Sequence, residues 1–180
     1  HYTNAMFEKE TEVLEEYESR ELMAGKVTLS KLKVTEQLVG YQKRRNGSQE
    51  LISQHDLTYP PITFETIGLA IAIPPETAEP STEEGLHFRG GIHGVEHALL
   101  ALAPLFAICD RNDMGGYSQT NHPHIGGPAV FLYDGHPGGI GLSKRLFHTF
   151  KDLLDRTYNL VSNCECLTGC PSCIHSPKCG

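Results

Sequence analysis

The sequence has no hydrophobic run long enough to cross a membrane, since a helical span needs about 20 apolar residues in succession. It shows no secretory signal, because its first residues are polar and acidic. Positive charge is also scarce: 15 Lys and Arg stand against 22 Asp and Glu, for a formal net charge of −7. We therefore expect a cytoplasmic protein with no membrane partner, and not a domain that holds nucleic acid mainly by bulk electrostatic attraction.

A phosphate-binding loop of the Walker type is missing as well. No G-x-x-x-x-G-K-[S/T] segment occurs in the 180 residues, so this chain should not hydrolyse ATP by a P-loop mechanism of its own. The composition is nevertheless that of a globular domain, with 39% hydrophobic and 21% charged residues. A chain of this length buries about 70% of its unfolded surface, so its core needs no cross-links.

Cysteine is almost absent from the first 163 residues, where Cys109 alone occurs and is expected to be a small core residue. The last 17 residues read C-E-C-L-T-G-C-P-S-C-I-H-S-P-K-C-G and contain Cys164, Cys166, Cys170, Cys173 and Cys179. Structural zinc takes four tetrahedral thiolate or imidazole ligands, and Cys170-Pro-Ser-Cys173 is a C-x-x-C knuckle. In a reducing compartment thiols bind metal more often than they pair. We predict zinc held by four of the five; disulfides, free thiols and an iron–sulfur cluster are the alternatives.

The first half of the chain is expected to be mostly β-structure. Residues 1–24 are interpreted as a tag remnant and an N-terminal segment, with an acidic helix over 7–22. Residues 25–74 should form a β-rich subdomain, in which Asn46-Gly47 is the turn of a β-hairpin. A Pro- and Glu-rich linker at 74–85 then marks the main internal boundary. The predicted strands cover 26–41, 50–58 and 62–73.

The second half, residues 86–180, should be a helical zinc-binding domain that ends in the Cys cluster at 164–179. Pro104 should kink the first predicted helix or end its first part. The predicted elements are helices over 92–109 and 142–160, with a glycine-rich loop at 110–127 and a buried strand at 128–133 between them. The expected fold class is α+β: an antiparallel β unit followed by a mainly helical half with a C-terminal zinc knuckle.

A second candidate site lies in His93-Gly-Val-Glu96-His97, which matches the inverted zincin pattern H-x-x-E-H. On a helix the two histidines are one turn apart and could share a metal, with Glu96 as the general base of a zinc-dependent hydrolase. The other interpretations are a second metal site and a hydrogen-bonded helix N-terminus. Because the helix is expected to start after Gly90-Gly91, His93 should lie near its first turn.

Two further segments admit a functional and a structural interpretation. In D-G-H-P-G-G-I-G at 134–141, glycines between a buried strand and a helix can aim backbone N–H groups at a phosphate. The structural alternative is a tight turn with Gly at positive φ. Likewise Lys43-Arg44-Arg45, beside the hairpin turn, is either a solvated tip or a contact with nucleic acid.

Four segments in order resemble the zinc-binding C-terminal domain of MrfA/YprA-type DEAD/DEAH-box DNA helicases: H-G-V-E-H-A-L-L, C-D-R-N-D-M-G-G-Y-S, P-A-V-F-L-Y-D-G-H-P-G-G-I-G and the cysteine-rich end. V-T-E-Q-L-V-G-Y-Q-K and L-T-Y-P-P-I-T-F-E-T are similar to the β-rich stretch before that domain, so the resemblance spans about residues 25–180.

This resemblance implies a non-catalytic accessory domain of an ATP-dependent 3′-to-5′ DNA helicase that acts in DNA repair, with one structural zinc on four of the terminal cysteines. The motor domains are absent from this sequence. They would bind ATP and Mg²⁺, would be partners of this domain within the same polypeptide, and would bring it to DNA in the full-length protein. The H-x-x-E-H motif then belongs to the accessory domain's own pattern. A pure protein-interaction module is the other class that we consider.

Overall fold

The computed structural model describes residues 1–22, 25–48, 50–78, 87–110, 112–167, 170 and 172–174. Six strands form one sheet in which every pair is antiparallel. The strand order is β1-β2-β4-β6-β5, and β3 pairs with the outer part of β2. The strands are β1 (Tyr2–Leu22), β2 (Gly25–Arg44), β3 (Leu51–Asp56), β4 (Ile62–Ala72), β5 (Met114–His122) and β6 (Gly127–Asp134).

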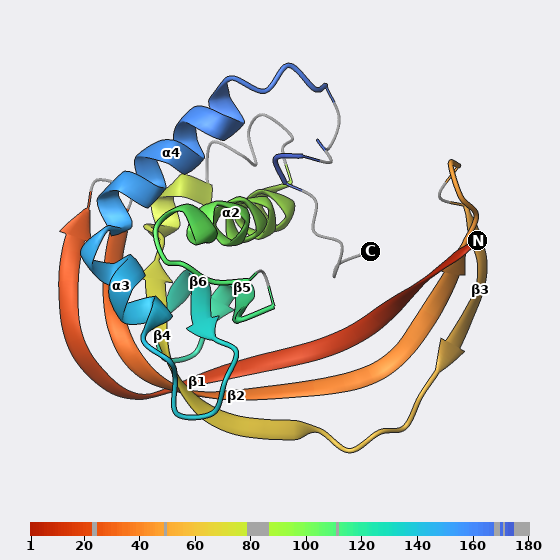
Figure 1. Ribbon diagram of the computed structural model, residues 1–180, viewed down its shortest axis with the longest axis horizontal. Helices are drawn as coiled ribbons and strands as arrows, with labels where there is room; N and C mark the ends of the chain where they lie inside the picture. Colours follow the sequence, from red (N-terminus) through yellow and green to blue (C-terminus); the bar gives the residue numbers. More distant parts are fainter. Residues whose placement is uncertain are drawn as a thin grey trace.

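The helices gather over one end of this sheet, whereas β1, β2 and β3 run out to the opposite end of the molecule (Figure 1). They are η1 (Pro75–Thr77), α2 (Phe88–Leu102), η2 (Ala103–Leu105), α3 (Leu142–His148) and α4 (Phe150–Ser162). The α+β class predicted from the sequence is therefore confirmed. None of the helices in the described part of the chain is both long and apolar enough to cross a membrane.

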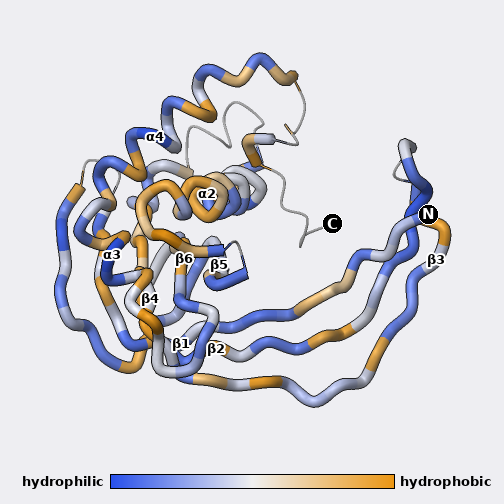
Figure 2. Tube along the Cα trace, in the orientation of Figure 1, coloured by the Kyte–Doolittle hydropathy of each residue, from blue (hydrophilic) through white to orange (hydrophobic). Residues whose placement is uncertain are grey.

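The hydrophobic core occupies both faces of the sheet at its helical end. Leu69 and Leu132 pack with the helices on one face, while Ala70 and Phe131 belong to a second cluster on the other face. Neighbouring residues of β4 and β6 are thus buried on opposite sides, which explains why these strands are continuous apolar runs. β1 is mostly hydrophilic from Glu8 onward (Figure 2).

The acidic segment 7–22 is a strand, so the predicted helix is wrong. β1 pairs with β2 from Tyr2 opposite Arg44 to Leu22 opposite Gly25. Three of its glutamates lie opposite lysines of β2, and one of these pairs is the contact of Lys33 with Glu12 at 3.4 Å. Strand formation depends on such cross-strand neighbours more than on the local preference of a Glu-rich segment.

The glycine-rich segment 110–127 contains β5, where a loop was predicted. Gly115 and Gly116 of this strand pack against residues distant in sequence that leave no room for a side chain. A Cβ at Gly116 would lie 2.7 Å from Oε1 of Glu96, and one at Gly115 would meet the ring of Tyr133. The glycines therefore permit close packing inside a strand.

Other expected elements appear near their predicted places. The strands at 26–41, 50–58, 62–73 and 128–133 are β2, β3, β4 and β6, and Gly47 takes a positive φ of 87° in the hairpin turn. The helix predicted at 92–109 is α2, which begins earlier, at Phe88, and does not reach Cys109. It ends at Leu102, and Pro104 lies in η2, as the predicted break at this proline requires. The helix predicted at 142–160 is divided at Thr149 into α3 and α4. Most of the predicted linker, residues 79–85, lies outside the described range.

Candidate metal centre and its surroundings

Three cysteines after α4 converge. The Sγ atoms of Cys164, Cys170 and Cys173 lie within 4.8 Å of one another. The backbone N–H groups of Cys173 and Ile174 donate to the carbonyl of Cys170 at 3.3 and 3.1 Å, which forms the turn expected of the C-x-x-C knuckle. A tetrahedral site with Zn–S bonds of about 2.3 Å places its sulfur atoms about 3.8 Å apart. The donor set and its spacing therefore fit a zinc ion.

Hydrogen bonding makes the thiols unequal. The backbone N–H of Ser172, followed by the thiols of Cys173 and Cys164, lowers the pKa of Cys170 to about 6. Hydrogen bonds to the Cys170 and Cys164 sulfurs raise the pKa of Cys173 to about 12 and that of Cys166 to about 11. The lowered pKa favours the thiolate of Cys170, the form that binds metal, and a metal ion would displace the neighbouring protons.

Of the five predicted ligands, the structure brings three together, Cys164, Cys170 and Cys173. Cys166 is exposed and hydrogen-bonds to Cys164 and Cys170, and it lies beside the group of three. Cys179 lies outside the described residues. Three ligands are therefore placed by geometry, and the fourth is a choice between Cys166 and Cys179. Cys109 packs half-buried against the core, as predicted, and burial raises the pKa of its thiol.

The knuckle rests on two helices, a feature that spacing of the cysteines did not reveal. Cys173 is buried, and its Sγ lies 3.9 Å from the carbonyl oxygen of Leu160 in α4. Nδ1 of His97 in α2 lies 2.7 Å from the carbonyl oxygen of Ile174. The side chain of Ile174 also covers Gly94, where an added Cβ would meet it at 3.6 Å. The cysteine cluster and the histidine motif are therefore neighbours.

The histidine motif forms a compact hydrogen-bonded group in α2. Nδ1 of His93 lies 2.9 Å from Oε2 of Glu96, and the hydroxyl of Ser118 in β5 donates to the same oxygen at 2.7 Å. The His93 and His97 ring centroids are 4.2 Å apart. Because α2 begins at Phe88, His93 lies in its second turn, and the sequence-based placement near the first turn is wrong.

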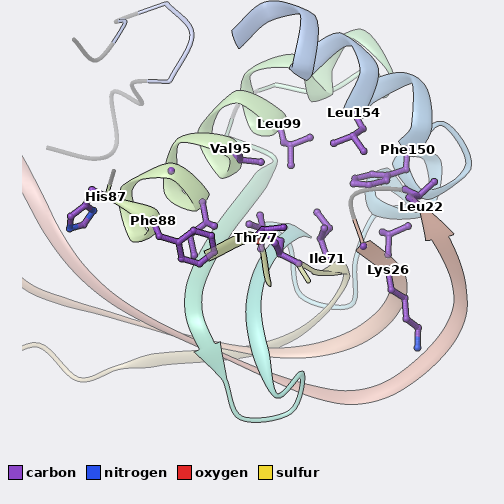
Figure 3. A pocket seen from close by; sticks show the side chains of 16 residues that line it. Leu22, Lys26, Ile71, Thr77, His87, Phe88, Val95, Leu99, Phe150 and Leu154 are labelled. Carbon is purple, nitrogen blue, oxygen red and sulfur yellow. The ribbon is translucent and has the colours of Figure 1, made fainter. Parts of the chain in front are cut away.

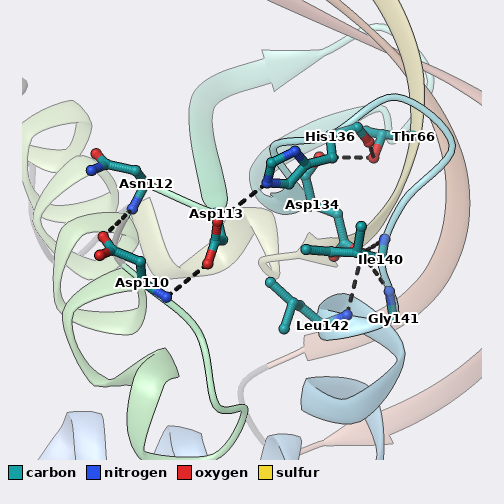
Figure 4. Close-up of polar contacts among 9 residues, drawn as sticks. All are labelled: Thr66, Asp110, Asn112, Asp113, Asp134, His136, Ile140, Gly141 and Leu142. Carbon is teal, nitrogen blue, oxygen red and sulfur yellow. Dashed lines mark hydrogen bonds and ion pairs between the residues drawn. The ribbon is translucent and has the colours of Figure 1, made fainter.

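The glycine loop at 134–141 organises itself around an internal carboxylate (Figure 4). Oδ2 of the buried Asp134 accepts hydrogen bonds from the backbone N–H groups of Ile140, Gly141 and Leu142 at 2.7, 2.9 and 3.2 Å. Its Oδ1 accepts from the N–H and hydroxyl of Ser143 at 2.7 and 2.6 Å. The N–H groups that an external phosphate would need are thus donated to Asp134, and the tight-turn interpretation is confirmed by positive φ at three glycines: Gly138, Gly139 and Gly141.

A second polar group in Figure 4 joins the segment before β5 to this loop. Asp113 accepts from the backbone N–H of Asp110 at 2.8 Å and contacts Nε2 of His136 at 3.2 Å. These two contacts, the first being the larger, hold the pKa of Asp113 below its ordinary value. Their role is to fix two loops relative to each other.

Among the described residues, the basic side chains of the hairpin tip contact neighbours in the same hairpin. Lys43 lies over the ring of Tyr41, Arg44 donates to Gln42 at 2.8 Å, and Arg45 pairs with Glu50 at 3.4 Å. These are contacts of a solvated tip, and the proposed contact with nucleic acid stays a prediction.

A cavity of about 440 Å³ lies between α2, α4 and the start of β2 (Figure 3). Apolar side chains such as Ile71, Leu99 and Phe150 line it. Among the described residues it presents no cluster of polar groups that would orient a small molecule, so we assign it no ligand.

The family model described as the MrfA Zn-binding domain matches residues 95–174, from the middle of α2 to the knuckle. A Bacillus subtilis protein named uncharacterized ATP-dependent helicase YprA is 43% identical over 81 residues, which are 45% of this chain and 11% of that protein. Uncharacterized protein MJ1572.1 of Methanocaldococcus jannaschii is 39% identical over 92 residues, 49% of this chain and 82% of that protein. The crystal structure of the DUF1998 helicase MrfA bound to DNA matches 99% of this chain and 24% of its own, with a TM-score of 0.69 and 28% identity.

The fold and the thiol cluster define a zinc-binding domain of the α+β class. The chain belongs to the MrfA Zn-binding domain family and is homologous to the YprA, HRQ1 and MrfA helicases. It spans only 11% of YprA, 15% of the yeast HRQ1 helicase and 24% of the MrfA chain.

Proposed function

We propose that this chain is a non-catalytic, zinc-binding accessory region of an ATP-dependent DNA helicase that acts in DNA repair. The observation that carries the proposal is the likeness to DNA-bound MrfA, which extends over 99% of the chain at 28% identity. ATP and Mg²⁺ would be bound by motor domains of the same polypeptide, since this sequence has no P-loop. DNA would be engaged by the full-length, cytoplasmic protein.

Zinc would act as a cross-link in this domain. Cys164, Cys170 and Cys173 would hold the ion, together with Cys166 or Cys179. The segment from Cys164 onward has few apolar residues, so metal binding would supply its order; zinc-finger peptides gain about 10–16 kcal/mol in this way. Because Cys173 contacts α4 and Ile174 contacts α2, the ordered segment would brace both helices.

The arm offers a surface for docking on the motor domains. We define the arm as residues 2–8, 37–48 and 50–56, the part of β1 and β2 beyond the pairing with β4, together with β3. It carries large apolar side chains that are about half exposed, namely Phe7, Leu51 and Ile52. Exposed apolar groups on a projecting sheet suit contact with protein better than contact with phosphate.

The experiment compares the full-length helicase with its Cys170→Ser/Cys173→Ser variant, and uses Cys109→Ser as a matched control. Elemental analysis should find about one zinc in the native and control proteins and none in the double variant. DNA-dependent ATP hydrolysis should fall in the double variant alone, because the motor loses a fixed neighbour. Retention of a full equivalent of zinc by the double variant would contradict the zinc assignment.

Two further measurements test the helicase role. The isolated chain should show neither ATPase nor peptidase activity. Deletion of residues 26–180 from the full-length protein should weaken its salt-dependent binding to DNA. Unchanged binding would show that the domain does not contribute to DNA binding and would favour a protein-interaction module.

The hydrolase alternative receives no support from the geometry of Glu96. A general base must face the water that a metal activates. Glu96 is only 5% exposed, and its Oε2 already accepts from Ser118 and contacts His93. Its arrangement is that of a carboxylate that orients a histidine ring.

A further inference from the structure

The histidine pair in α2 has the hydrogen bonding of metal ligands. Nδ1 of His97 faces the carbonyl oxygen of Ile174, which can only accept, so Nδ1 carries the hydrogen. Ser118 donates its hydroxyl hydrogen to Glu96, so Nδ1 of His93 is the donor toward both of these partners, at 2.9 Å to Glu96 and 3.2 Å to Ser118. In each neutral ring the lone pair then lies on Nε2.

This arrangement is the one that proteins use to orient metal-binding imidazoles. A ligating histidine almost always donates its other ring N–H to a carboxylate or a backbone carbonyl, which fixes its tautomer and its direction. Here one ring is held by each kind of acceptor, Glu96 and the Ile174 carbonyl. The rings lie one helical turn apart with centroids separated by 4.2 Å. One ring nitrogen of each histidine and a carboxylate oxygen of Glu96 lie within 4.8 Å of one another, close enough for the group to hold a single ion.

The carboxylate that supports this pair is built into the fold. Glu96 is buried in a helix that packs on β5, and Gly116 leaves the space for its Oε1, since a Cβ there would lie 2.7 Å away. A buried carboxylate is costly unless it is hydrogen-bonded or paired with positive charge. The hydroxyl of Ser118 and the Nδ1–H of His93 supply two hydrogen bonds, and a bound cation would add the charge.

We propose that His93 and His97 bind a divalent transition-metal ion of the zinc or nickel class through their Nε2 atoms, with Glu96 as the orienting carboxylate. Imidazole ligands suit zinc, copper and nickel, whereas the thiolate cluster selects zinc. With His93 42% exposed at its side chain, the ion is accessible, and water or a partner group completes its coordination. The ion is therefore held more weakly than the zinc of the cysteine cluster and exchanges with solution. The proposal goes beyond the structural zinc and does not depend on helicase activity.

The test titrates Ni²⁺ into the 180-residue chain already loaded with one equivalent of zinc, and follows heat of binding and release of zinc. One further equivalent should bind without displacing zinc. His93→Ala should lower the nickel affinity at least tenfold, and Glu96→Gln should lower it roughly tenfold through loss of orientation. His148→Ala, which removes an exposed histidine from α3, is the matched control and should bind nickel as the native chain does.

Each remaining outcome decides the proposal. No second equivalent in the native chain, or equal nickel binding by the native chain and His93→Ala, overturns it. Loss of the first zinc equivalent from His93→Ala, with no nickel site in the native chain, would make the motif a support of the cysteine cluster alone. Nitrogen NMR of the imidazoles provides an independent check, since both rings should be Nδ1–H tautomers before nickel is added. If the Cys cluster fails to hold zinc, the proposed function fails, yet the nickel titration still gives its own answer.

Discussion

The arm and the rest of the described domain, which we call the body, differ in how the shared sheet is packed. In the body, β4 and β6 are buried on both faces, and their residues join one core cluster with α2, α3 and α4 and a second cluster with β1 and β2. Among the described residues, none in the arm belongs to either cluster. The body is therefore stabilised by its own packing, whereas the arm depends on strand pairing and offers its apolar side chains to other surfaces.

The largest difference should appear when one aromatic ring is removed from each region. Phe131→Ala should lower the free energy of unfolding by about 4 kcal/mol, because removing this fully buried ring leaves a cavity. Phe7→Ala in the arm should cost less than about 0.5 kcal/mol, since its ring is half exposed. Urea unfolding of both variants gives the comparison. Equal losses would show that the arm is as tightly packed as the body.

Removal of zinc should also affect the two regions differently. An ion that binds only the folded chain stabilises it by about 2.7 kcal/mol when free zinc is 100 times its Kd. A chelator should lower Tm and reduce hydrogen-exchange protection in α4 and α2, which contact the knuckle, but leave protection of the arm unchanged. The Cys170→Ser/Cys173→Ser variant should show no further change with chelator. Loss of protection spread evenly over arm and body would contradict a local cross-link.

The smallest effect concerns pH and the loops of the body. The folded-state pKa of Asp113 lies below its ordinary 3.8, chiefly because Asp110 donates its N–H and then because of His136. Its contribution to stability is therefore fully present above pH 3.8 and is lost as pH falls through the lower folded-state pKa. Asp113→Asn should flatten the fall in stability below about pH 4, measured by unfolding at several pH values. An unchanged acid profile would mean that the contact adds nothing.

Local signals predicted the elements whose reasons are local. Asn46-Gly47 indicated the hairpin, the apolar runs indicated β4 and β6, and Pro104 ended its helix. β1 could not be found in this way, since its Glu-rich sequence favours a helix and only pairing with β2 makes it a strand. β5 was missed because the neighbours that require Gly115 and Gly116 come from β6 and α2.

The candidate sites show the same difference between local and long-range determinants. Cysteine spacing was sufficient to predict the metal cluster, because the knuckle turn is local. The sequence could not show that the N–H groups of the glycine loop donate to Asp134, because the sequence does not distinguish a carboxylate that accepts internal hydrogen bonds from an exposed one. The link from His97 to Ile174 crosses 77 positions of the chain and needed the packed structure.

By itself, the sequence determined the donor chemistry of this protein: a thiol cluster, two histidines one helical turn apart, no P-loop and a net negative charge. These properties follow from residue types and short spacings, which folding does not alter. Only the tertiary structure decided what those groups face. Hydrogen bonds are directional and short, so the tautomers of His93 and His97, the burial of Glu96 and the anchoring of the knuckle exist only where distant strands and helices meet.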